Sequence, residues 1–144
     1  MTPQCTVARN MFDDVELAYL RSQPLARLAT VGPDGQPDNS PVSFEFDGEV
    51  FWVGGFDVTA TRKYHNVAGG GNRAALVIDD LESVDPWRPR GIRVYGTADV
   101  VDRQGRFGSA PYLRITPTVS WSWALEVPFG GPDSPPSRKR TLWR

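Results

Sequence analysis

The stretch PVSFEFDGEVFWVGG, residues 41–55, decides the fold class of this chain. It places two runs rich in aromatic and β-branched residues on either side of Asp47-Gly48. Such a dipeptide is typical of tight hairpin turns, because both residues tolerate the positive φ angles that these turns require. The stretch therefore predicts two antiparallel strands joined by a short turn.

Further strands are predicted on both sides of this hairpin. Alternating or continuous apolar patterns indicate four more, at residues 25–32, 73–80, 91–102 and 112–127, the last with a bend or an edge at Pro117. Near the N-terminus, FDDVELAYLRS (12–22) has apolar residues at helical spacing behind an acidic first turn. We therefore expect a mainly β fold, a small six-stranded barrel with a few short helices.

The composition argues against several classes of function. The chain has 144 residues, a formal net charge of −1 and a pI near 5.8, so nothing attracts nucleic acid or anionic lipid globally. A single cysteine, Cys5, and a single histidine, His65, exclude an intrachain disulfide and a Cys/His metal site. There is no signal segment and no apolar run long enough to span a membrane, so we expect a cytoplasmic protein.

The composition changes after residue 129. Residues 1–129 are expected to form one domain, and 130–144 a Pro/Gly-rich basic tail. The tail sequence GGPDSPPSRKRTLWR favours a solvated segment. The alternative is that SRKR and Leu142-Trp143 clamp onto a neighbouring molecule.

The first candidate site is TATRKYHN, residues 59–66. With Asp57 or Thr59 as N-cap, it reads as the start of a short helix that carries an Arg-Lys pair. Hydroxyls beside a guanidinium and an ammonium are suited to a phosphate group. A solvated helix face with ordinary caps is the alternative.

Two further patches carry candidate residues. In WRPR (87–90), prolines stiffen a loop that exposes Trp87, Arg88 and Arg90, which either bind an anionic partner or are ordinary surface charges. In SWSW (120–123), Trp121 and Trp123 share one face of a strand. They would wall an apolar polycyclic substrate pocket, or else belong to the core or to a dimer interface.

The order of these segments resembles the pyridoxamine 5′-phosphate oxidase-like split-barrel family. The resemblance covers residues 12–127 and rests on ATVGPDGQP, on the RK-x-x-N pattern at Arg62-Lys63 and Asn66, and on the strand spacing. It is nearest to the coenzyme F420-dependent branch, and VDPWRPRGIRVYG with RITPTVSW is similar to a subgroup that includes dehydrotetracycline reductases. The resemblance implies a six-stranded split β-barrel and a homodimer that holds a deazaflavin or flavin between its subunits.

Site residues follow from the same resemblance. The ring system would lie on two strands, at Ser40, Pro41, Val42, Val53 and Gly54, although Val42 and Val53 also suit a barrel core. The phosphate would be held by Thr59, Thr61, Arg62, Lys63 and Asn66. Trp87, Arg88 and Arg90 would meet the ring and the polyanionic tail of F420, and Trp121 and Trp123 the substrate.

The implied function is hydride transfer from reduced F420 to an unsaturated, enone-like small molecule, with no residue identified as catalytic. Two alternatives stay open: an FMN-binding oxidoreductase of the same fold, and a non-catalytic F420- or flavin-binding protein. Vitamin B6 chemistry is not expected. The arginine-rich C-terminal motif of the oxidases is not recognisable, and the connection at residues 102–111 is too short for the helix of many relatives.

Overall fold

The computed structural model describes residues 10–144, and Cys5, for which the sequence predicts no role, lies outside them. Within residues 10–144, eight strands and two α-helices follow one another. They are α1 (Asp14–Ser22), β1 (Ala26–Val31), β2 (Pro37–Val42), β3 (Glu45–Phe46), β4 (Phe51–Val53), η1 (Val58–Ala60, a 3₁₀ turn), α2 (Arg62–Ala68), β5 (Arg73–Ser83), β6 (Arg88–Gly105), β7 (Gly108–Trp123) and β8 (Arg138–Leu142).

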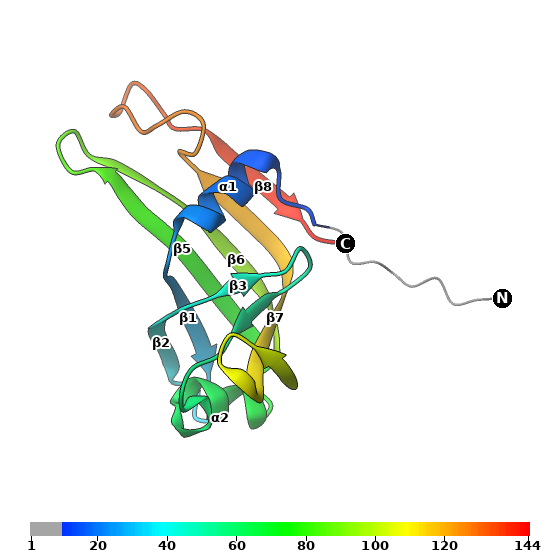
Figure 1. Cartoon of the computed structure of the whole chain (residues 1–144). Coiled ribbons are helices and arrows are strands. Elements are labelled where there is room, and N and C mark those ends of the chain that lie inside the picture. Colours follow the sequence, from blue (N-terminus) through cyan, green and yellow to red (C-terminus); the bar gives the residue numbers. More distant parts are fainter. Residues whose placement is uncertain (1–9) are drawn as a thin grey trace.

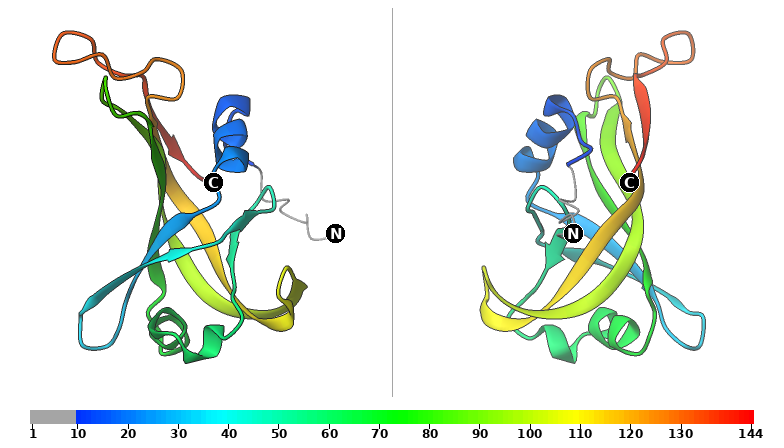
Figure 2. Two further views of the ribbon diagram at one scale, coloured as in Figure 1. Left: turned by 60° about the vertical axis from the view of Figure 1, so that its left-hand side comes forward. Right: turned by 90° about the vertical axis from the view of Figure 1, so that its right-hand side faces the viewer.

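All strands belong to one antiparallel sheet in the order β2-β1-β5-β6-β7-β4-β3, with β8 added to β7. The mainly β class is confirmed, with eight strands in place of six. The sheet is strongly twisted, with α1 near one end and α2 near the other (Figures 1 and 2). The predicted hairpin is present, since β3 pairs with β4 around a turn in which Gly48 has a φ of 99°.

The inward side chains of the central strands form the core. Leu28, Leu76, Ile78, Ile92 and Ile115 are completely buried, as the alternating patterns predict. Helix α1 closes one end of this core with Tyr19 and Leu20. It begins with a capping box between Asp13 and Glu16.

Residues 102–111, a connection too short for the helix of many relatives, form the tip of the long hairpin of β6 and β7. The two strands stay paired to Gly105 and Gly108 at the turn. A register shift opposite Pro117 confirms the predicted bend, because proline has no N–H to donate to the ladder.

The interpretation of residues 130–144 as a solvated tail is wrong for their second half. Strand β8 pairs with β7 from Val119 to Trp123. That edge is free because β4 occupies only the stretch from Leu113 to Ile115. Trp143 then packs against the core aromatic residues Phe12 and Phe46, at ring-centroid distances of 4.8 and 6.2 Å. The last residues therefore belong to the domain.

Candidate functional site

The start of α2 is the first candidate site, and it lies near β1 and β2. The helix begins at Arg62, and its N-cap is Thr61, whose hydroxyl oxygen accepts a hydrogen bond from the Tyr64 amide at 3.3 Å. The predicted caps Asp57 and Thr59 are therefore wrong, because residues 58–60 form a separate 3₁₀ turn. The Thr61 hydroxyl also donates to the Val58 carbonyl, so it is used within the turn.

Two cations remain at this corner. Lys63 Nζ lies 3.4 Å from the hydroxyl of Ser40 on β2, which joins two predicted site residues that are far apart in sequence. Arg62 and Thr59 are exposed beside them. Neither cation has an ion-pair partner among the described residues. An exposed arginine and a half-buried lysine, both unpaired and next to hydroxyls, can bind a phosphate.

Asn66 has a structural role at the same corner. Its side chain is only 4% exposed and donates a hydrogen bond of 3.0 Å to the hydroxyl of Thr30 on β1. A side chain at Gly32 would lie 2.5 Å from the Asn66 amide oxygen, so this glycine makes room for the contact. Asn66 fastens α2 to the sheet and is not available to a ligand.

The residues predicted for the ring system lie on β2 and β4, two strands that are not neighbours in the sheet. Val42 and Val53 point into the core, at 6% and 0% exposure, so only their backbones can meet a ligand. A side chain at Gly54 would clash with the ring of Tyr112, which occupies that space. Pro41 and Gly55 remain open to an approaching group.

The WRPR patch lies at the other end of the sheet from α2 (Figure 1). The prediction of a loop is wrong for most of it, because only Trp87 lies in the turn after β5, and residues 88–90 are the start of β6. Trp87 is 55% exposed. Arg90 is used within the chain, because its guanidinium forms two hydrogen bonds to Asp80, of 2.8 and 3.1 Å. The hydrogen bond from Arg90 is the main reason why the pKa of Asp80 lies below its usual value. Within one chain, this patch therefore lies too far from the start of α2 to belong to the same site.

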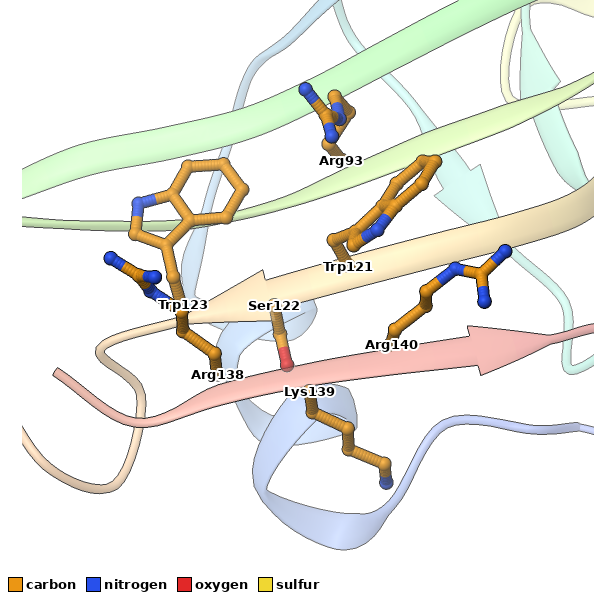
Figure 3. Close-up of a pocket in the computed structure, with 7 residues that line it drawn as sticks. All are labelled: Arg93, Trp121, Ser122, Trp123, Arg138, Lys139 and Arg140. Atoms are coloured by element: carbon orange, nitrogen blue, oxygen red, sulfur yellow. The ribbon is translucent and has the colours of Figure 1, made fainter.

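A groove of about 600 Å³ on the outer face of the sheet contains Trp121 and Trp123. We call it the indole–guanidinium groove, because three arginines from the two flanking strands line it beside the indoles: Arg93 on β6, and Arg138 and Arg140 on β8 (Figure 3). Ser122 and Lys139 complete the lining. The register explains this, since Trp121 lies opposite both Arg93 and Arg140, and Trp123 opposite Arg138. Residues directly opposite in a ladder point to the same face.

These three arginines are not recognisable as site residues in the sequence. Arg93 follows the outward alternation of its strand, and SRKR is visibly basic, but neither feature shows which strand lies beside Trp121. A glycine helps to shape the groove. A side chain at Gly91 would lie 2.7 Å from the Trp123 ring, so the indole can lie over this position.

Comparison with known proteins agrees with this architecture. Residues 12–143 match the family model described as pyridoxamine 5′-phosphate oxidase. The chain is 39% identical over 121 residues to a 5a,11a-dehydrotetracycline/5a,11a-dehydrooxytetracycline reductase of Streptomyces rimosus subsp. rimosus. This match covers 80% of the chain and 84% of the relative.

Two solved structures illustrate the fold. An F420 reductase is 25% identical with a TM-score of 0.54, and the match covers 70% of this chain and 92% of that one. HupZ of Group A Streptococcus is 21% identical with a TM-score of 0.63, covering 78% and 94%. The chain therefore belongs to the pyridoxamine 5′-phosphate oxidase family and is an oxidoreductase.

Proposed function

We propose that this protein is an F420H2-dependent reductase that transfers a hydride to an unsaturated, enone-like small molecule of natural-product biosynthesis. The observation that carries the proposal is the 39% identity, over most of both chains, to a dehydrotetracycline reductase. When bound, reduced F420 supplies the hydride. The protein's part is to hold cofactor and substrate close together and to exclude water.

The α2 corner is the proposed phosphate site. Lys63 and Arg62 supply positive charge, Ser40 supplies a hydroxyl beside Lys63, and Thr59 supplies an exposed hydroxyl in the preceding turn. The fit is chemical, because an unpaired ammonium and a guanidinium match the charge of a phosphate. Thr61 and Asn66 hold the start of α2 in place through their hydrogen bonds to Val58 and Thr30.

We further propose that the cofactor lies between two copies of the chain, so that the working form is a homodimer. Phe56, directly after the predicted ring residues, is 99% exposed and contacts Phe107 at the tip of the β6–β7 hairpin. On the outer face of the sheet, Val31 and Tyr95 are 43% and 44% exposed and line a second, largely apolar groove. Such surfaces are suited to a second copy, which would also bring Trp87 and Arg88 to a shared site.

Binding of F420 to the Lys63→Ala variant tests the phosphate site. Charge-assisted hydrogen bonds are worth about 1.5–3 kcal/mol, so affinity should fall roughly 10- to 150-fold. Arg62→Ala should cost a similar or smaller factor. The matched control is Arg21→Ala, which removes an exposed cation of α1 and should change nothing.

The phosphate-free deazaflavin fragment is a second control, because its affinity should be the same for wild type and Lys63→Ala. Equal losses for the whole cofactor and the fragment would refute the phosphate role. Tight binding of FMN with none of F420 would favour the FMN-dependent alternative. Binding of F420 without turnover of any enone would favour the non-catalytic one. Sedimentation that shows a monomer with tightly bound cofactor would contradict the shared site.

A further inference from the structure

The indole–guanidinium groove has an excess of positive charge. Among the described residues, no carboxylate lies within ion-pair distance of Arg93, Arg138 or Arg140. A nearby carboxylate on the outer face, Asp79, is paired with Arg27. Three unpaired guanidiniums thus gather on one surface of a protein whose net charge is −1.

Arg93 has the most unusual surroundings of the three arginines. Its guanidinium lies over the Trp121 ring, 4.3 Å from the ring centroid, and also over Tyr95 at 5.2 Å. Its Nε is buried and has no hydrogen-bond partner among the described residues. A guanidinium that stacks on an indole keeps its in-plane N–H groups free for an acceptor. A buried donor without an acceptor is uncommon in folded proteins.

The shape of the groove restricts what can enter it. Trp121 and Trp123 give it two flat, apolar surfaces, and the guanidiniums of Arg93, Arg138 and Arg140 lie around them (Figure 3). Indole faces favour flat ring systems, and guanidinium forks favour oxygen anions in a bidentate geometry. A volume of about 600 Å³ is in the range of ordinary small-molecule sites.

We propose that the indole–guanidinium groove binds the substrate, and that the substrate is a flat polycyclic molecule carrying an acidic oxygen group such as a carboxylate or an ionised enol or phenol. This rests on the proposed reductase function and adds the charge of its substrate. The ring system stacks on Trp121 and Trp123. Arg93, Arg138 and Arg140 hold the acidic oxygens and set the orientation.

A second copy of the chain is a poorer occupant. In a twofold contact through this groove, the three arginines would meet the same three arginines, and like charges repel. The second groove, lined by residues such as Val31, Ala75, Tyr95 and Val119, contains a single charged side chain, Arg73, in place of three arginines. Dimerisation through the apolar groove leaves the charged groove next to the interface, because Tyr95 of the apolar groove lies edge-to-face against Trp121 of the charged groove in the same chain.

A matched pair of probes tests the proposal on the full chain without cofactor. The probes are 2-anthracenecarboxylate and 2-anthracenecarboxamide, which share the ring and the size and differ in charge at pH 7.5. Their affinities are measured by calorimetry. Wild type should bind the carboxylate about tenfold more tightly than the amide.

The variants Arg140→Gln and Arg138→Gln should each remove most of that preference while leaving binding of the amide unchanged. Arg114→Gln is the matched control on β7, because Arg114 is already paired with Asp99. It should behave as wild type. Trp121→Ala should weaken both probes alike. Equal affinity of wild type for acid and amide, or a preference that survives in Arg140→Gln, would overturn the proposal.

Two more measurements test whether the cofactor or a second copy of the chain, and not the substrate, occupies the groove. If F420 displaces 2-anthracenecarboxylate competitively, from wild type and from Lys63→Ala alike, the groove holds the acidic tail of the cofactor and not the substrate. If Arg140→Gln changes the sedimentation of the protein, the groove is a contact between copies. Either result overturns the assignment. Failure of F420 to bind would overturn the reductase proposal and leave the probe results as they are.

Discussion

The two faces of β8 use the same kind of residue in opposite ways. On the inner face, Lys139 donates hydrogen bonds to Asp13 at 2.7 Å and to Glu16 at 3.2 Å, which ties the strand to α1. On the outer face, Arg138 and Arg140 flank the tryptophans of β7 and have no ion-pair partner among the described residues. Of three consecutive basic residues, one thus holds the fold together and two line the groove.

The difference gives a rule for the other cations of this molecule. Arg90, predicted as a cofactor residue, lies against Tyr19 and pairs with Asp80, so it resembles Lys139 and stabilises the packing of α1. Lys63 and Arg62 have no carboxylate partner in residues 10–144, so they resemble Arg140. A cation that has its counter-charge in its own chain contributes to stability, and one that lacks it is available to an anion.

The largest expected effect comes from the inner face. Trp143→Ala removes the packing on Phe12 and Phe46 and the hydrogen bond of 2.9 Å from the indole to the Ser120 hydroxyl. We expect the free energy of unfolding to fall by about 3 kcal/mol, measured by urea denaturation. Trp143→Phe keeps the ring and should lose only about 1 kcal/mol. If Trp143→Ala were as stable as wild type, β8 would be a loosely attached tail.

Lys139→Met should have the next largest effect. It leaves the carboxylate of Glu16, which is only 2% exposed, without its cation. We expect a loss of about 2 kcal/mol in the free energy of unfolding, partly restored in the double variant with Glu16→Gln. Full stability of the single variant would show that this ion pair does not fasten β8 to α1.

The loss of stability in Lys139→Met should depend on pH in a defined direction. Burial raises the pKa of Asp13, but the hydrogen bonds from Lys139 and from the Glu16 amide outweigh it, so the pKa lies below 3.8. A carboxylate with a lowered pKa stabilises the fold above its unfolded pKa and loses this effect as the pH falls. Wild type and Lys139→Met should therefore differ most near neutral pH and converge below about pH 4. Thermal melts from pH 3 to 7 measure this.

The smallest effect on stability is expected on the outer face. Arg140→Gln removes an unpaired cation from the groove and should change the free energy of unfolding by less than about 0.5 kcal/mol. A gain in stability would agree with relief of repulsion among the three arginines. A loss comparable to that of Lys139→Met would mean that Arg140 has a structural partner, and the contrast between the two faces would fail.

Much of the fold was predictable from local patterns. The Asp47-Gly48 hairpin, the helix ending at Ser22 and the alternation in β5 to β7 each depend on neighbouring residues. The corner of Arg62 and Lys63 was also visible in sequence, although its contact to Ser40 was not. Strand β8 was missed because a basic, proline-preceded segment has no strand pattern of its own. It forms because β7 leaves part of one edge free.

The sequence by itself determined the class of fold, the family resemblance and the positions of the tryptophans and of the Arg-Lys pair, because these depend on residue type and short spacing. Only the tertiary structure decided which cations are paired. The registers of β6 and β8 against β7 bring Arg93, Arg138 and Arg140 to Trp121 and Trp123, and they send Lys139 to the opposite face. Register depends on contacts between strands far apart in sequence, so no local pattern contains it.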